Sequence, residues 1–253
     1  MTNKPPTSVS LVIPMFNEEL SIDHAIDCAI DALESFDYEI VIVDDASTDR
    51  SAEIVRARMA ENPRIRLLQH ETNRKLGGAL KTGYGAAMKE VVVYMDADLP
   101  FDPEVIGRAM RALHVTRADM IAGYRLDRTT EGFKRTVYSY LYNTLIGLLF
   151  GWPHRDINFS FKLMRREVLE AVELRAEGSL IDAELIVKAR NLGFVIQQLG
   201  LVYFPRSQGT STLSSPKVIL KIFRELIQLY PEMKHPHRKQ PAQAVTDPQP
   251  AHP

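Results

Sequence analysis

Short apolar runs alternate with stretches of helical periodicity along the first half of the chain, and this alternation limits the fold more than any other feature. Strands are predicted at 8–13, 39–43, 65–69, 91–95 and 120–123, and helices at 20–35, 51–60, 79–88 and 103–113. The second run, from Glu39 to Val43, is β-branched and too continuous for a half-exposed strand, which is typical of a strand covered on both faces. The alternation predicts an α/β fold: a mostly parallel central sheet with helices on both faces.

Polar residues gather directly after three of these predicted strands. They are Pro14, Phe16, Asn17 and Glu18 after the first, Asp44, Asp45, Ser47 and Asp49 after the second, and Asp96 and Asp98 after the fourth. In open α/β sheets, ligands bind outside the carboxyl ends of the strands. The sequence therefore predicts a ligand site at this edge, built mainly from carboxylates.

Asp96 and Asp98 flank a single alanine, so two hard oxygen ligands can approach one cation and leave positions for water and a diphosphate. This pattern indicates Mg²⁺ or Mn²⁺. The alternative is that one of them caps the next helix. Asp102, just before Pro103, is better placed to supply that cap.

Asp44 and Asp45 have two interpretations. Asp and Ser side chains often bond to nearby backbone groups, so the segment can be a simple turn and helix cap. However, two adjacent carboxylates after an apolar strand repel each other unless donors or a cation lie near them. We therefore also expect hydrogen bonds from these residues to the base or ribose of a nucleoside.

Several common site types do not fit the sequence. The glycine-rich stretch 77–83 lacks the spacing of a Walker loop and resembles a tight helix start, and no G-x-G-x-x-G follows the first strand, which argues against a classical dehydrogenase. A formal net charge of −1 argues against a nucleic-acid partner. A single cysteine, Cys28, excludes an internal disulfide.

Two segments, 133–151 and 216–230, are amphipathic and carry basic residues, but both are too short or too charged to span a bilayer. They suit either a membrane interface or packing against the domain or another subunit. With no signal peptide apparent, we expect a cytoplasmic protein, peripheral at the membrane. Residues 234–253 are predicted to be a disordered Pro-rich tail.

The ordered set of strand-end motifs is more specific than any one of them. It runs from Ile13-Pro14 to Asn17-Glu18, from Val43-Asp44-Asp45 to Asp49, and through Met95-Asp96-Ala97-Asp98. The set resembles family 2 glycosyltransferases, and among them the dolichyl- and polyprenyl-phosphate sugar synthases, over residues 9–215. The resemblance implies a GT-A fold over 1–233, with a donor half at about 8–125 and an acceptor half at about 126–233.

Later motifs carry the resemblance to the lipid-phosphate enzymes. They are Gly123-Tyr124-Arg125, the spacing of Arg135, Ser139 and Asn143, the segment from Asp156 to Lys162, the Asp182-x-Glu184-Leu185 helix, and the segment from Arg206 to Ser211. Two departures stand out. Pro100 occupies the position where these synthases usually have Gln, and Lys162 replaces an Arg.

The resemblance implies a role for each group of residues. Asp96 and Asp98 would hold the metal and diphosphate; Pro14, Phe16, Asn17, Glu18, Asp44, Asp45 and Asp96 would contact the donor. Arg125 and Arg206 would act in catalysis, and the acceptor would meet Arg125, Arg135, Ser139, Arg206 and Ser211.

The expected reaction is inverting, metal-dependent transfer of a hexose from a GDP- or UDP-sugar to a polyprenyl or dolichyl monophosphate, with a membrane-protein partner also considered. Two alternatives stay open. A sugar-hydroxyl or other soluble acceptor, for example in cell-envelope glycan synthesis, would need a carboxylate base such as Asp156. A non-catalytic nucleotide-sugar binding module would explain Pro100.

Overall fold

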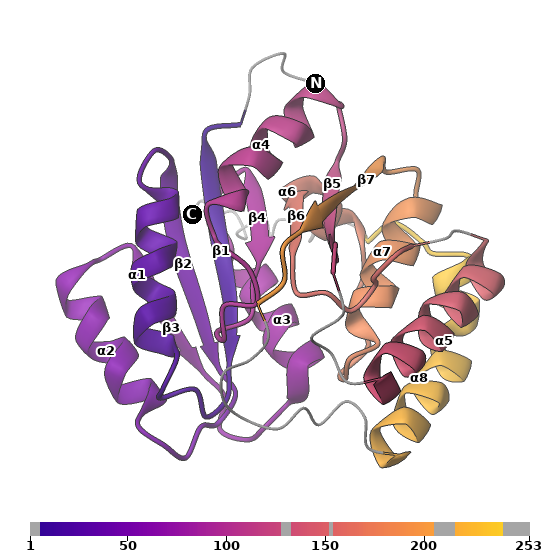
Figure 1. The fold of residues 1–253 in the computed structure, drawn as a ribbon, viewed down its shortest axis with the longest axis horizontal. Helices are drawn as coiled ribbons and strands as arrows, with labels where there is room; N and C mark the ends of the chain where they lie inside the picture. Colours follow the sequence, from indigo (N-terminus) through magenta and orange to yellow (C-terminus); the bar gives the residue numbers. More distant parts are fainter. Residues whose placement is uncertain (1–5, 128–132, 152–153, 205–215, 240–253) are drawn as a thin grey trace, which may run out of the picture.

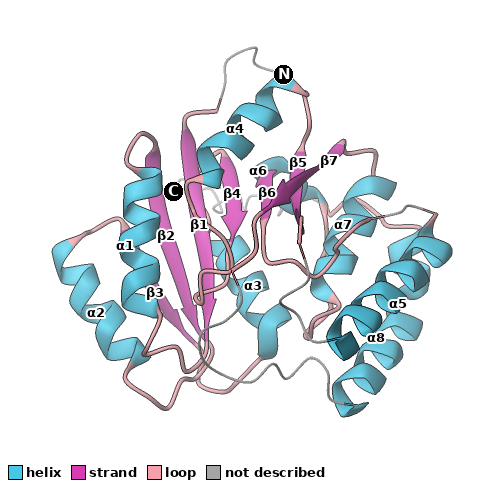
Figure 2. Ribbon diagram, viewed as in Figure 1, coloured by secondary structure: helices cyan, strands magenta, loops and turns pink. Residues whose placement is uncertain are grey.

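A seven-stranded sheet with helices on both faces forms the centre of the protein (Figures 1 and 2). The computed structural model describes residues 6–127, 133–151, 154–204 and 216–239. The strand order is β3-β2-β1-β4-β6-β5-β7. The predicted α/β architecture is thereby confirmed.

The elements of the first half follow the predicted alternation closely. They are β1 (Ser8–Met15), α1 (Ile22–Leu33), β2 (Asp37–Asp44), α2 (Ser51–Glu61), β3 (Ile65–Gln69), α3 (Lys75–Ala86), β4 (Val91–Tyr94), α4 (Val105–Val115) and β5 (Met120–Arg125). The second half adds α5 (Phe133–Phe150), β6 (Lys162–Arg165), α6 (Arg166–Ala171), α7 (Ile181–Asn191), β7 (Ile196–Leu201) and α8 (Pro216–Lys234).

One strand of the sheet runs against the others. β1 pairs in parallel with β2 and β4, β2 with β3, and β5 with β7, whereas β6 is antiparallel to both of its neighbours, β4 and β5. The carboxyl ends of the six parallel strands therefore lie at one edge, and the amino end of β6 lies there too. The loop that leads into β6 reaches the predicted ligand edge for this reason.

Two apolar layers cover the sheet. One lies under α1 and α4 and includes Leu11, Ile13 and Ile121; the other lies under α3 and α7 and includes Val12 and Val41. Successive residues of one strand face opposite layers, which explains why residues 11–13 of β1 and 40–43 of β2 are continuously apolar.

The glycine-rich stretch lies in the first turns of α3, which begins at Lys75, four residues earlier than predicted. A Cβ on Gly77 would lie 2.4 Å from the carbonyl oxygen of Ala176, and the Gly77 amide donates to the carbonyl of Glu177 at 2.8 Å. The glycines therefore allow α3 to pass close to the segment before α7, which is a packing role.

The helices α5 and α8 lie side by side at one end of the molecule (Figure 1). The rings of Phe150 and Tyr230 are 5.4 Å apart and join them. Among the described residues, no helix has the length and apolar character needed to cross a bilayer. Beyond α8, the amide of Lys239 donates to the carbonyl of Ala171 at 2.9 Å, and the rest of the predicted tail, 240–253, lies outside the described residues.

The glycines of α3 allow a matched test of the packing between α3 and the sheet. A Cβ on Gly83 would lie 2.3 Å from Val12 Cγ1, whereas a Cβ on Gly85 would meet no atom within 4 Å. We expect Gly83→Ala to lower the free energy of unfolding by about 1–3 kcal/mol through overpacking. Gly85→Ala should raise it by about 0.5–1 kcal/mol, because alanine is the better helix former. Urea denaturation of both variants measures the difference, and equal effects would contradict this packing.

Candidate active site

The loops after β1 and β2 are joined by hydrogen bonds between side chains and backbone. The amide of Asn17 donates to Ser47 Oγ at 2.9 Å, and Asn17 Oδ1 accepts from the amide of Thr48 at 2.8 Å. The amide of Glu18 donates to Ser51 Oγ at 2.8 Å. Asn17 therefore holds the two loops together, and one rigid surface forms at the carboxyl ends of both strands.

Asp49 completes this junction by accepting from the amide of Glu19 at 3.1 Å and from Ser51. Burial opposes ionisation of Asp49, but hydrogen bonds from Ser51 and the Glu19 amide outweigh it and hold the pKa of this carboxyl below its ordinary value. Asp49 is therefore a structural anion of the loop.

Asp44 and Asp45 are both buried, and protein groups satisfy them. Asp44 accepts from the Ser47 amide and from Gln69 Nε2, each at 2.9 Å. Asp45 Oδ1 accepts from the Arg74 amide at 2.7 Å and lies 2.7 Å from His70 Nδ1. Hydrogen-bond donors therefore satisfy each of these adjacent carboxylates, as the sequence led us to expect. Most of these donors come from the end of β3 and the start of α3.

His70 was not identified from the sequence. Its Nε2 lies 2.9 Å from Thr82 Oγ1 on α3, so the ring bridges this helix and Asp45. The signal was present, because Gln69 and His70 stand at the end of a strand like the other selected residues.

Phe16, a predicted donor residue, is 47% exposed. Pro14 lies within β1 opposite Val43, and Glu18 Oε2 accepts from Ser21 Oγ at 2.8 Å. The exposed aromatic face of Phe16 is suited to lie against a planar base, whereas Pro14 and Asn17 shape the backbone around it.

Asp96 and Asp98 follow β4 directly, and both are partly exposed. The Tyr94 hydroxyl donates to Asp96 Oδ1 at 2.8 Å. Burial, and then the charges of Asp96 and Asp182, raise the pKa of Tyr94 well above its ordinary value, so the phenol keeps its proton. One oxygen of Asp96 is therefore oriented by a donor from the preceding strand.

The donor set at this loop fits a hard divalent cation. Within the described part of the chain, no group of three or more His, Cys, Asp or Glu side chains is placed to hold a metal ion. A cation at Asp96 and Asp98 would take its other ligands from water and the substrate. This is the usual arrangement for Mg²⁺, which proteins bind with one or two carboxylates together with substrate phosphates.

Pro100 is buried and makes a backbone contact in place of a side-chain one. Its carbonyl accepts from the amide of Phe204 at 2.9 Å. The loop that carries Asp96 and Asp98, called the metal loop after its predicted role, is thereby attached to the segment after β7. The preceding residue, Leu99, has φ of 48°, and the residues Asn17 and Ala46 in the loops after β1 and β2 also have positive φ. Such strain in non-glycine residues is found most often at functional sites.

Arg125, at the end of β5, is held on three sides. Its NH1 donates to Asp156 Oδ2 at 2.8 Å, and its guanidinium lies 5.0 Å from the ring centre of Phe159 and 4.8 Å from that of Tyr203. The Arg125 side chain is only 10% exposed and that of Asp156 only 1%. This cage fixes the direction of the guanidinium and uses Asp156 as its partner.

Asn143, on α5, holds the loop that carries Asp156. It donates to the Arg155 carbonyl at 3.2 Å and accepts from the Ile157 amide at 3.0 Å. The buried His154 accepts from the Asp156 amide at 3.2 Å, and burial together with the charge of Lys162 lowers the pKa of His154 to about 3. His154 is therefore neutral in this loop.

The remaining predicted acceptor residues are described only in part. Ser139 is half-buried on α5, one turn before Asn143. Arg135 lies in the first turn of α5, but its side chain is outside the described residues, as are Arg206 and Ser211 altogether.

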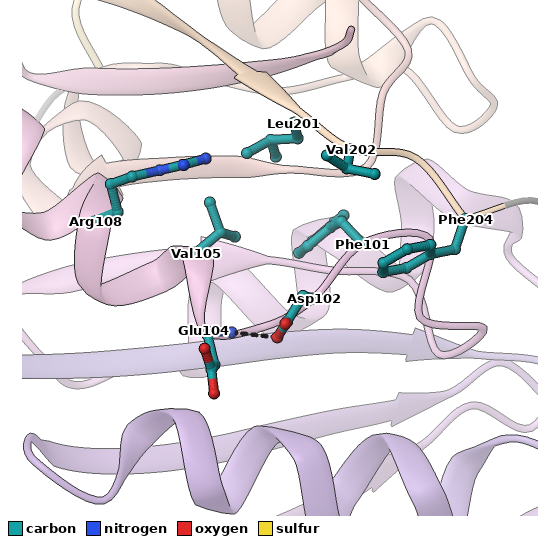
Figure 3. A pocket seen from close by; sticks show the side chains of 8 residues that line it. All are labelled: Phe101, Asp102, Glu104, Val105, Arg108, Leu201, Val202 and Phe204. Atoms are coloured by element: carbon teal, nitrogen blue, oxygen red, sulfur yellow. Dashed lines mark hydrogen bonds between the residues drawn. The ribbon is translucent and has the colours of Figure 1, made fainter. Parts of the chain in front are cut away.

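A pocket of about 420 Å³ opens on the α4 side of the sheet, just past the metal loop (Figure 3). It is lined by Phe101, Asp102, Glu104, Val105, Arg108, Leu201, Val202 and Phe204. None of the residues predicted for donor, metal or acceptor lines this pocket. Asp96, Asp98 and Arg125 instead lie at the carboxyl ends of β4 and β5.

Comparison with known proteins agrees with this geometry. The sequence profile of glycosyl transferase family 2 matches residues 10–173. Dodecaprenyl-phosphate galacturonate synthase from Rhizobium johnstonii is 32% identical over 70% of this chain and 54% of its own. Dolichol-phosphate mannosyltransferase from Pyrococcus furiosus is 29% identical over 87% of this chain and 63% of its own. The chain thus spans about half to three fifths of the length of these relatives.

The fold has solved counterparts. Glucosyl-3-phosphoglycerate synthase from Mycobacterium tuberculosis, in complex with Mn²⁺, UDP and phosphoglyceric acid, superposes with a TM-score of 0.71 at 19% identity, over 88% of this chain and 78% of that one. The GT-A fold implied by the sequence is confirmed by this likeness. Since the family profile covers well over half of the 253 residues, the chain belongs to glycosyltransferase family 2.

Proposed function

We propose that this glycosyltransferase moves a hexose from a GDP- or UDP-sugar to a polyprenyl or dolichyl monophosphate at a membrane surface. The observation that carries the proposal is the arrangement at one sheet edge of two unlike groups: the carboxylates Asp96 and Asp98, and the caged guanidinium of Arg125. The first group suits a metal diphosphate and the second suits a phosphate acceptor. The lipid-phosphate enzymes among the relatives support the choice of acceptor.

On the donor side, the nucleoside lies against the loops after β1 and β2. Phe16 offers its exposed ring to the base, and Asp45, held by His70 and the Arg74 amide, orients the edge of the loop. Mg²⁺ or Mn²⁺ bound by Asp96 and Asp98 would neutralise the leaving diphosphate. The protein groups position the donor, and the cation supplies the charge that the leaving group needs.

On the acceptor side, the chemistry requires cations more than a base. A phosphate monoester is already anionic at neutral pH, so its oxygen can attack the anomeric carbon as the bond to the donor diphosphate breaks, with inversion. Arg125 offers a fixed positive charge for that phosphate, and Arg135 and Arg206 are proposed to assist it. These charges draw the acceptor toward the anomeric carbon without removing a proton from it.

The structure does not favour the sugar-hydroxyl alternative. That reaction needs a carboxylate with access to the acceptor, and Asp156 was the candidate. Its side chain is 1% exposed and its Oδ2 is bound to Arg125 at 2.8 Å. Asp156 is therefore better suited to orient Arg125 than to act as a base.

Contact with the membrane is proposed for the outer faces of α5 and α8. Large apolar side chains are exposed there, namely Val137, Tyr138, Tyr140, Leu141, Leu148, Leu220, Phe223 and Ile227. Exposed Lys221 and Arg224 lie on the same stretch of α8. Apolar residues next to basic ones are typical of helices that lie in the interface of an anionic bilayer.

The proposed reaction can be tested directly with labelled donors. UDP- and GDP-hexoses are incubated with undecaprenyl or dolichyl phosphate and Mn²⁺, and label is followed into an organic-extractable product that mild acid releases. We expect transfer with one donor, and we expect EDTA to abolish it. Asp98→Asn should reduce transfer at least about a hundredfold, since the charge stabilisation that the metal gives the transition state is worth several kcal/mol. Label that enters only water-soluble products would contradict the lipid acceptor.

Membrane contact has its own test, which needs no substrate. We expect Leu148→Glu combined with Ile227→Glu to weaken co-sedimentation with anionic liposomes, because the charges remove apolar insertion. The control is Val115→Glu at the end of α4, where the exposure of 78% matches the 74% of Ile227. If the control and the double variant bind liposomes equally, the proposed surface is wrong.

A further inference from the structure

Two side chains on neighbouring strands connect the loop of Asp96 and Asp98 with the loop before β6, which carries Asp156 and is called the acceptor loop below. Tyr94, the last residue of β4, and Lys162, the first residue of β6, are direct partners in the antiparallel pairing of these strands. Both are buried, with exposures of 1% and 0%, and the Lys162 ammonium lies 5.8 Å from the centre of the Tyr94 ring. Neither was selected from the sequence as a site residue.

The Lys162 ammonium has three close oxygen neighbours. It donates to the carbonyl of Ile157 at 2.7 Å, to the carbonyl of Phe159, and it pairs with Asp182 Oδ1 at 2.8 Å. Asp182 lies in the first turn of α7 and is itself buried. A compact ammonium suits this set of acceptors better than a planar guanidinium does.

These contacts hold the loop that supports Arg125. Ile157 and Phe159 lie in the segment that begins at Asp156, and both Asp156 and Phe159 form part of the Arg125 cage. A buried charge with two hydrogen bonds and an ion-pair partner resists displacement, because any movement leaves a charge without partners in a medium of low polarity. Lys162 therefore fixes where Arg125 points, although it does not touch Arg125 itself.

Tyr94 performs the corresponding task on the other strand. Its hydroxyl orients Asp96, at 2.8 Å, and its ring packs against the Lys162 ammonium. We propose that Tyr94 and Lys162 are positioning residues for the transfer reaction: Tyr94 sets the metal carboxylate, and Lys162 sets the acceptor loop. The role of Lys162, called the acceptor arm below, rests on the proposed function. The role of Tyr94, called the metal arm, depends only on Asp96.

The metal arm is tested by binding of Mn²⁺ in the presence of UDP or of GDP, measured by calorimetry. Tyr94→Phe should weaken Mn²⁺ binding about tenfold or more, the usual effect of removing a group that orients a metal ligand. Tyr84→Phe is the control, because Tyr84 is buried in the same apolar layer and its hydroxyl has no hydrogen-bond partner in the described structure. Equal Mn²⁺ affinity of both variants would overturn the role of Tyr94.

The acceptor arm is tested by steady-state kinetics with the lipid phosphate. Lys162→Met should lower kcat/KM for the acceptor about a hundredfold, the scale of a misplaced catalytic group, and leave Mn²⁺ and nucleotide binding unchanged. Lys162→Arg should recover part of this loss, because it restores the charge. Lys188→Met is the control: Lys188 forms another buried ion pair, with Glu184 at 2.6 Å, and its other hydrogen bond goes to the carbonyl of Glu173, not to the acceptor loop.

Loss of the Lys162 charge leaves Asp182 buried alone, so the single variant can fail to fold. Lys162→Met with Asp182→Leu removes both charges and keeps an apolar interior. If this folded double variant, or Lys162→Met, transfers sugar as well as Lys188→Met, the positioning role is wrong. If the unaltered protein itself transfers no sugar to lipid phosphate, the proposed function is wrong. The role of Tyr94 is then still decided by the Mn²⁺ binding measurement.

Discussion

The backbone pairing of β6 with β4 and β5 is the constraint on which the site depends. In a sheet of parallel strands only, the residues that precede a strand lie at the edge opposite the ligand site. Because β6 is reversed, its first residue, Lys162, lies beside the last residue of β4, and the loop that contains Asp156 reaches the ligand edge. The loop that carries Asp96 and Asp98 and the loop that carries Asp156 lie at the same sheet edge for this topological reason.

The two halves of the site are held by different interactions. In the predicted donor part, the loops after β1 and β2 are joined by hydrogen bonds from backbone amides to side chains, as between Thr48 and Asn17 and between Glu19 and Asp49. In the predicted acceptor part, around Arg125 and the loop before β6, buried charges hold the structure, with Arg125 paired to Asp156 and Lys162 paired to Asp182. Buried ion pairs contribute little net stability but fix geometry, since breaking one leaves an uncompensated charge. The acceptor half therefore gains precision more than stability.

The sequence predicted the fold and the positions of the strand-end carboxylates well, and the second half of the chain less well. Periodicity and the strand-end rule located every parallel strand of the donor half and the carboxylates beyond them. The short strand β6 and the partners of Lys162 could not be read from periodicity, because four residues carry too little pattern and a buried lysine resembles a surface one. Long-range contacts such as Lys162 with Asp182, twenty residues apart, depend on the topology of the folded sheet.

Because Pro100 has no side-chain oxygen, binding of a cation depends more strongly on the orientation of Asp96. The related synthases usually carry a Gln at this position, and its side chain would offer the cation another oxygen. Here the residue contributes only its carbonyl, which accepts from Phe204 and joins the metal loop to the segment after β7. A cation would then rely on two carboxylates of the chain, so a rotation of either one removes half of the protein ligands. The hydrogen bond from Tyr94 opposes that rotation at Asp96, and it comes from a strand that the reversed β6 holds in place.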